Sequence, residues 1–172
     1  GAAHDTTRIP ILPSAIANDG TVAGNIDGHA ATWKNGHVTI LDTATSVASA
    51  ICKCESATVV GSVIVNGVEH AAIWLYGIRI DAGLPPNGVS AAFVAIGGGF
   101  VVANASVRVP GDTATYVEPY SWSRAEGWSR MRHELLYGYR RVAINPHGLT
   151  VVNTVGLLPT PPRTLTLTRS TP

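Results

Sequence analysis

Between residues 116 and 141 the chain holds its densest group of side chains that could make specific contacts. The group consists of tyrosine, tryptophan and arginine residues. These residue types dominate the energetics of many protein interfaces, because each buries a large planar group while keeping a hydrogen-bonding end. We therefore predict a binding surface in this segment, with Trp128 as its exposed aromatic residue. Its members are Tyr116, Tyr120, Trp128, Arg130, Arg132 and Tyr137. The alternative is a long, solvated hairpin whose arginine stems cover apolar surface.

Two histidines and three tryptophans recur at like positions along the chain: His29, His70, Trp33, Trp74 and Trp122. The histidines could bind metal or sugar, but a symmetric metal site would need one in every repeat. The tryptophans could stack on sugars. Their identical place in each repeat favours packing between sheets, where one ring fills the same gap each time. We predict that all five are structural residues and that no metal is bound.

No sequence motif for catalysis or cofactor binding stands out. The chain has no Gly-x-Ser-x-Gly elbow, no His-Glu-x-x-His motif and no phosphate-binding loop. The glycines at 97–99 precede an expected strand rather than a helix, so they predict a turn. The carboxylates are scattered, although a pair at a ring entrance, Glu118 among them, could serve glycan hydrolysis. We predict no cofactor and no catalytic residue, and keep a carbohydrate-active enzyme as an alternative.

The two cysteines, Cys52 and Cys54, are separated by one residue. They could be small residues near a turn, form a local disulfide, or take part in metal or redox chemistry. A zinc site is poorly supported because no second cluster of cysteine or histidine accompanies them. The pattern leaves their redox state open.

The elements that must position these residues are four copies of one unit. The unit is clearest over residues 14–41, where short apolar strands are separated by turns such as Asp27-Gly28 and Asn35-Gly36. Asn-Gly and Asp-Gly favour the backbone of two-residue hairpins. Within a single domain over residues 1–172, we expect further copies over 49–81, 91–132 and 142–169. The last copy lacks a fourth strand, and we expect residues 8–12 to supply it.

These repeats predict an all-β fold with four four-stranded units in a β-propeller-like ring, closed by the N-terminal strand. The repeat tryptophans lie about 40 to 48 residues apart, close to the period of a four-stranded blade. Pairing the two chain ends would leave fewer exposed strand edges. The alternatives are a β-sandwich and an open array whose ends pair with another copy of the chain.

Composition narrows the classes of partner. The chain has 172 residues, of which 45% are hydrophobic and only 13% are charged, and its formal net charge is +1. This charge gives no case for nucleic-acid binding. The longest apolar run, around residues 90–105, is too short and too rich in glycine for membrane insertion. Low charge with abundant Thr, Ser, Asn and Gly is common in β-rich extracellular proteins.

The motif Ala-Ile-Asn-x-x-Gly-x-Val-x-Gly followed by His-Ala-x-x-Trp-x-x-Gly is similar to that of the HAF repeat family of bacterial proteins. The first copy carries it at Ala15, Ile16, Gly20, Val22, Gly24, His29, Ala30, Trp33 and Gly36. The second copy follows it closely, the third replaces the histidine motif, and the fourth loses both His and Trp. The resemblance implies a propeller-like fold and secretion, and it implies no chemistry.

From these observations we expect a secreted binding or assembly module. A rigid propeller would present loops to a protein or a surface glycan, and oligomers are possible. The first alternative is the extracellular carbohydrate-active enzyme. The second is a strand-donating subunit, in which residues 8–12 complete a neighbouring molecule's last unit.

Overall fold

The structure is a computed structural model that describes residues 8–53, 57–97, 99–111, 113–131, 139–144, 149–154 and 165–169. All regular structure in these ranges is β-strand, arranged in four antiparallel sheets of consecutive strands. The first sheet contains β1 (Leu12–Ile16), β2 (Val22–Ile26), β3 (His29–Lys34) and β4 (His37–Ile40). The second contains β5 (Ser46–Lys53), β6 (Ala57–Val65), β7 (Val68–Leu75) and β8 (Ile78–Gly83).

The third sheet contains β9 (Gly88–Gly97), β10 (Phe100–Arg108), β11 (Thr115–Ser123) and β12 (Gly127–Arg130). The fourth has three strands, β13 (Tyr139–Ile144), β14 (Leu149–Thr154) and β15 (Leu165–Arg169). The prediction of an all-β fold with repeated four-stranded sheets is therefore confirmed for the first three units.

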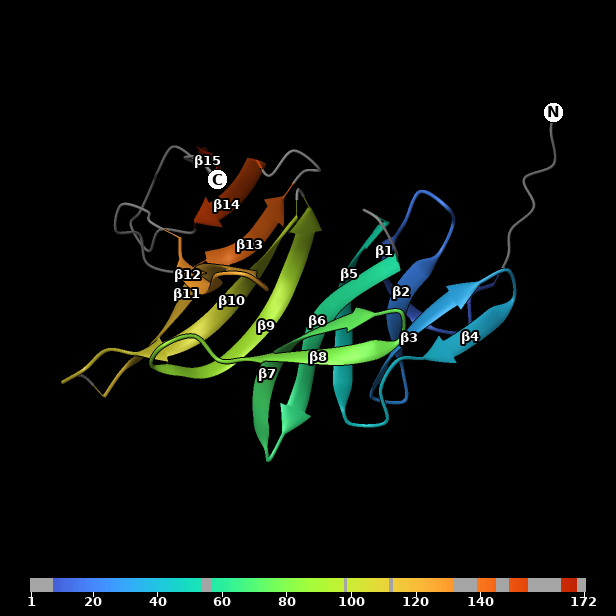
Figure 1. The fold of residues 1–172 in the computed structure, drawn as a ribbon, viewed down its shortest axis with the longest axis horizontal. Coiled ribbons are helices and arrows are strands. Elements are labelled where there is room, and N and C mark those ends of the chain that lie inside the picture. Colours follow the sequence, from blue (N-terminus) through green and yellow to red (C-terminus); the bar gives the residue numbers. More distant parts are fainter. Residues whose placement is uncertain are drawn as a thin grey trace, which may run out of the picture.

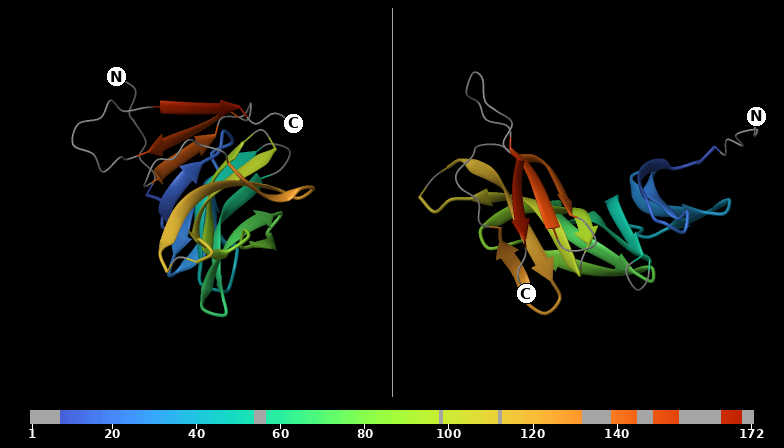
Figure 2. Two further views of the ribbon diagram at one scale, coloured as in Figure 1. Left: turned by 90° about the vertical axis from the view of Figure 1, so that its left-hand side faces the viewer. Right: turned by 90° about the horizontal axis from the view of Figure 1, so that it is seen from above.

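The sheets follow one another in space in the order in which they occur in the chain (Figure 1). The first strand of each later sheet packs on the sheet before it: β5 on β1–β3, β9 on β5–β7, and β13 on β9–β11. The first and fourth sheets lie at opposite ends of this row, as the view from above in Figure 2 shows. The described sheets form an open array and are not closed into a ring.

Local sequence explains the hairpins. In the turns Asp27-Gly28, Asn35-Gly36 and Asn66-Gly67 both residues have positive φ, between 49° and 85°. These are the angles of a type I′ turn, whose twist matches that of the flanking strands. Asn, Asp and Gly accept this backbone at little cost, so the turns fix the strand register on either side.

A bulge at the start of each of the first two sheets explains the Val-x-Gly motif. The register shifts between Pro13 and Ala15 in β1, and between Ala48 and Ala50 in β5. At each bulge a carbonyl group lies over the glycine of the neighbouring strand. A Cβ atom on Gly61 would overlap the carbonyl oxygen of Val47, and Gly24 has the same relation to Leu12. Only glycine fits beneath these carbonyl groups.

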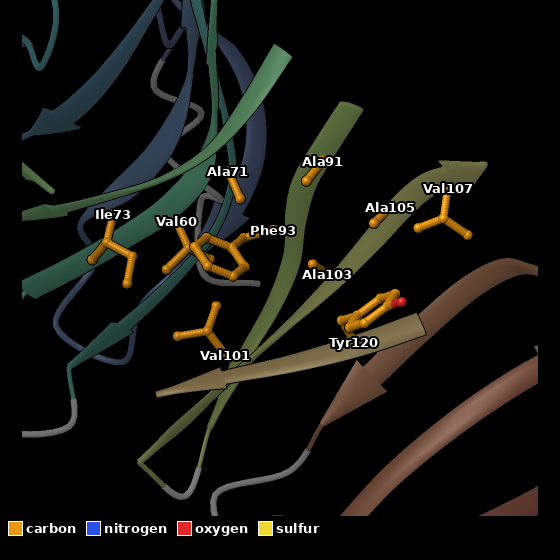
Figure 3. Close-up of a cluster of buried hydrophobic side chains, with 10 residues drawn as sticks. All are labelled: Val60, Ala71, Ile73, Ala91, Phe93, Val101, Ala103, Ala105, Val107 and Tyr120. Atoms are coloured by element: carbon orange, nitrogen blue, oxygen red, sulfur yellow. The ribbon is translucent and has the colours of Figure 1, made fainter. Parts of the chain in front are cut away.

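The largest core cluster lies between the second and third sheets. Val60, Ala71 and Ile73 of the second sheet face Phe93, Val101 and Tyr120 of the third (Figure 3). A second cluster joins the first and second sheets, with Ala23 and Ala30 opposite Val59, Val63 and Trp74. Small residues on one sheet thus receive larger ones from the next, which lets each pair of sheets approach closely.

The N-terminal segment does not complete the last sheet, so that expectation is wrong. Ile9 and Ile11 pack on Val22, Ala31 and Trp33 of the first sheet, and Ile11 is buried there. Residue Leu12 pairs with Asn25 in β2. The physical reason is proximity: the two isoleucines reach an apolar sheet face directly beside them in the chain, whereas the fourth sheet lies at the far end of the array.

Candidate functional site

Two of the predicted binding residues, Tyr120 and Trp128, belong to the core. The ring of Trp128 stacks on Phe93, with 5.4 Å between centroids and 22° between planes, and meets Tyr120 edge-on at 6.1 Å. Its Nε1 donates a hydrogen bond of 2.9 Å to the carbonyl oxygen of Ala82 in the second sheet. The prediction that Trp128 is an exposed aromatic is therefore wrong, because its strand turns the ring toward the neighbouring sheet.

The remaining predicted binding residues do not gather into one site. Arg130 is exposed and forms an ion pair of 2.5 Å with Glu118. Tyr116 is half-buried and interacts within the protein. Burial, followed by the nearby Glu118 carboxylate, raises the pKa of Tyr120. Arg132 and Tyr137 lie outside the described residues.

The repeat histidines make contacts that tie strands to neighbouring segments. Nδ1 of His29 lies 3.0 Å from the carbonyl oxygen of Ala44, to which it donates. Nδ1 of His70 lies 3.2 Å from both carboxylate oxygens of Asp81, across the hairpin. Among the described residues, no three His, Cys, Asp or Glu side chains are placed to hold a metal ion.

The repeat tryptophans occupy like register positions but have different surroundings. Trp33, Trp74 and Trp122 stand opposite a valine in the adjacent strand, at Val22, Val59 and Val101. Trp74 is only 1% exposed and donates from Nε1 to Asp42, at 3.1 Å. Trp33 is half-buried on the outer face of the first sheet. Trp122 packs on Phe93 and lines a pocket.

Asp42 holds the junction beside Trp74. Its side chain is 8% exposed and accepts hydrogen bonds from the backbone N–H of Ala44, from Trp74 and from Arg79. Burial by itself raises the pKa of Asp42, but these hydrogen bonds and the charge of Arg79 outweigh it, so its pKa is lowered. Trp74 and Arg79 thus share one carboxylate at this junction.

The next junction, between the second and third sheets, holds a pocket of about 640 Å³. Its walls are formed by the aliphatic side chains of Ile73, Leu75, Ile80, Ile96 and Val101. The volume is within the range of about 300–1,000 Å³ that is typical of small-molecule sites. The pocket lies where the turns after β7, β9 and β11 come together.

Tyr76 stands at this pocket with its side chain 77% exposed. It occupies the first position of the β7–β8 turn with φ +53°, followed by Gly77 at +76°. The equivalent position in the first sheet is Asn35, a residue suited to this backbone. An exposed tyrosine in the left-handed region is held against its own preference, a feature that concentrates at functional sites.

Arg124 supplies the charge of the pocket. It lies in the β11–β12 turn, beside Ser123 and Trp122, and is exposed. Within the described part of the chain it makes no ion pair or hydrogen bond. The described residues that line the pocket include no aspartate or glutamate. The described lining is therefore an apolar cavity with aromatic rings and one guanidinium group.

Sequence reasoning placed Tyr76 in a turn and Trp122 in the core, and it did not bring either together with Arg124. One signal was available. The turns Asp27-Gly28, Asn35-Gly36 and Asn66-Gly67 begin with Asp or Asn, whereas Tyr76-Gly77 begins with an aromatic residue. That exception to turn chemistry marked the site, but the partner sheet could not be identified from it.

Cys52 lies next to the pocket and is disulfide-bonded. It pairs with Thr58, which lines the pocket, in the register of β5 and β6. Of the three possibilities, a disulfide at Cys52 is therefore the one that the structure shows, and Cys54 lies outside the described residues. A disulfide persists in oxidising compartments.

Comparisons with known proteins bear on the fold alone. No protein-family model matches the chain, and no curated protein matches its sequence. A crystal structure of TolB from Acinetobacter baumannii is similar, with a TM-score of 0.57 and 10% sequence identity. The similarity covers 86% of this chain and 38% of the TolB chain, so this chain spans well under half of that protein. TolB contains a β-propeller, and the similarity concerns the all-β fold alone.

In the described part of the chain, no helix has the length and the apolar character needed to cross a membrane.

Proposed function

We propose that this chain is a secreted binding module that holds a protein or glycan partner on a propeller-like scaffold. The pocket between the second and third sheets is the single observation that carries this proposal. It combines a sizeable apolar cavity, an exposed tyrosine in an unfavourable backbone conformation and an arginine that makes no ion pair with the described residues. These features have no evident role in holding the sheets together.

The scaffold supports the same proposal. Each of the second and third sheets presents its valine–tryptophan pair toward the preceding sheet, as propeller blades do when they stack around an axis. Turns at one end of such an array are held by strands on both sides, so their side chains are pre-organised for binding. The disulfide at Cys52 and the low content of charged residues support an oxidising, extracellular setting.

The test is a binding survey of the full chain against a glycan array and a peptide library, repeated with two variants. Tyr76→Ser removes the exposed ring at the pocket and should abolish or strongly weaken the binding found for the native protein. Ile64→Ser is the control, because Ile64 is an exposed apolar residue near the opposite end of β6. Partners that bind both variants as well as the native protein would show that the pocket is not the binding site.

A second candidate, self-assembly, is favoured by the outer face of the first sheet. Ile16, on β1, is 69% exposed. Its register equivalents, Ile51 on β5 and Ile96 on β9, are half-buried against the preceding sheet. Ile9 and Ile11 cover part of this face, but none of the other described sheets packs over Ile16. A sheet from a second copy placed there would continue the array and move it toward a closed ring.

The solution mass of the full chain tests this second candidate. We expect a concentration-dependent oligomer that Ile16→Ser dissociates and that Val117→Ser, a change at another exposed apolar residue of similar size, leaves intact. A native chain that remains a monomer at high concentration would exclude assembly through this face.

A further inference from the structure

We propose that the pocket accepts an apolar, ring-sized group that carries an acidic group at its edge. This inference rests on the proposed binding function and specifies the chemistry of the contact. It starts from the pocket walls, which consist mainly of aliphatic side chains with Trp122 beside them. Burying apolar ligand surface against these walls favours binding. A neutral sugar would instead leave hydroxyl groups against aliphatic carbon without hydrogen-bond partners.

The positive charge of Arg124 favours a ligand with a negative charge. Among the described lining residues Arg124 is the one charged side chain, and the acidic residue nearest in the chain, Glu126, does not line the pocket. Glu126 is exposed, and its backbone N–H donates to Ser123 within the turn. Arg124 has no ion pair with the described residues, so an incoming anion displaces none of their carboxylates. A guanidinium group holds a carboxylate or sulfonate through two parallel hydrogen bonds.

The aromatic side chains set the shape of the ligand. Trp122, from the end of β11, and Tyr76, from the β7–β8 turn, line the pocket from different sheets. Trp122 is fixed by its contact with Phe93, at 5.8 Å between centroids. Tyr76 is exposed and free to stack. Two rings on neighbouring sheets favour a flat group between them, with its acidic substituent directed toward Arg124.

Two fluorescent probes isolate the acidic group. 1-Anilinonaphthalene-8-sulfonate carries a sulfonate on a flat aryl body, and N-phenyl-1-naphthylamine has the same body without the charge. In titrations of the full chain we expect the sulfonate to bind more tightly. Arg124→Gln should weaken the binding of the sulfonate by about threefold to tenfold, since an exposed ion pair contributes modestly to affinity. The binding of the neutral probe should be unchanged. Raising the salt concentration should weaken the sulfonate alone.

Two further variants complete the design. Arg108→Gln is the matched control, because Arg108 is an exposed arginine at the other end of β10. It should change the binding of neither probe. Tyr76→Ser should weaken the binding of both probes. The part of the binding that this variant loses belongs to the pocket, and the part that remains belongs to other exposed apolar surface such as Ile16. Both variants alter exposed residues, so loss of folding does not obscure the result.

The outcomes separate this inference from the proposed function. If both probes depend on Tyr76 but Arg124→Gln leaves the sulfonate unaffected, the pocket binds ligands and the acidic preference is wrong. If neither probe responds to Tyr76→Ser, the pocket is not a binding site and both proposals fail. Displacement of the sulfonate by a neutral oligosaccharide such as maltohexaose would also overturn the acidic, apolar class.

A free organic acid and the C-terminal residue of a protein share this chemistry, and two competitors distinguish them. Displacement of the sulfonate by 3-phenylpropionate at the same concentration as a pentapeptide ending in phenylalanine points to a free acid. Tighter binding of the peptide, lost when its terminal carboxylate is amidated, points to a protein terminus. Failure of both compounds to displace the probe contradicts the inference.

Discussion

The indole Nε1 of Trp74 donates a 3.1 Å hydrogen bond to the carboxylate of Asp42 and thereby joins the second sheet to the segment leading into it. The carboxylate is nearly buried and is shared with Arg79 and the backbone N–H of Ala44. At the next junction Arg79 is replaced in register by Trp128, whose Nε1 donates to Ala82 instead. The pocket lies at this second junction, between the second and third sheets.

Removing the carboxylate of Asp42 should destabilise the fold. Asp42→Ala leaves Trp74 Nε1 without its acceptor and Arg79 without its partner, and we expect a loss of about 1–3 kcal/mol in the free energy of unfolding. Urea denaturation followed by circular dichroism measures it. Asp27→Asn is the control, because Asp27 lies in an exposed turn and Asn suits its φ of +50°. Equal losses of stability in Asp42→Ala and Asp27→Asn would contradict a stabilising role of the Asp42 carboxylate.

The same carboxylate should make stability depend on acid. The pKa of Asp42 is lowered from its ordinary value of 3.8, so the unfolded chain binds its proton more readily than the folded chain does. Its contribution to stability is complete above about pH 4 and is lost as the pH falls through the lower, folded pKa. Denaturation midpoints between pH 2.5 and 6 should show a smaller acid loss for Asp42→Asn than for the native protein.

Adding a methyl group at Gly61 should lower the free energy of unfolding more than removing one at Ala103. Gly61→Ala places Cβ against the carbonyl group of Val47 in the bulge, and we expect a loss above about 3 kcal/mol. The equivalent position in the third sheet is Ala103, which already accommodates a Cβ atom. Ala103→Gly should cost only about 1–2 kcal/mol. Thermal unfolding of both variants measures the two losses. Equal losses would contradict a steric clash at Gly61.

Trp128 and Arg130 should behave as a core residue and a surface residue. Trp128→Phe keeps most of the stacking on Phe93 but removes the donor to Ala82, and we expect a loss of about 1–2 kcal/mol. Arg130→Ala breaks an exposed ion pair and should cost less than about 1 kcal/mol. A larger effect of Arg130 than of Trp128 on chemical denaturation would contradict their placement.

Replacing Tyr76 by asparagine should trade binding for stability. Asparagine suits the positive φ of the β7–β8 turn, as Asn35 does in the first sheet, so we expect a gain of about 0.5–1 kcal/mol. The same change removes the ring from the pocket and should weaken the aryl probes. Melting temperature and probe titration on one sample test both effects. A destabilised variant would mean that the tyrosine ring contributes packing that outweighs the strain of its backbone.

The sequence by itself determined the repeating four-stranded units and the positions of most hairpins. Asp27-Gly28, Asn35-Gly36 and Asn66-Gly67 specify their turns through backbone angles of adjacent residues, and strand alternation is equally local. These properties depend on neighbouring residues in the chain, so they can be predicted without the tertiary structure.

Only the tertiary structure decided what each sheet face meets. Trp128 is internal because the second sheet offers Ala82 and Phe93 lies beneath it, and Ile11 is buried because the first sheet lies beside it. Tyr76 and Arg124 belong to one pocket although 48 residues separate them in the chain. Packing between sheets sums many long-range contacts of similar strength, so a local pattern does not specify which of them form.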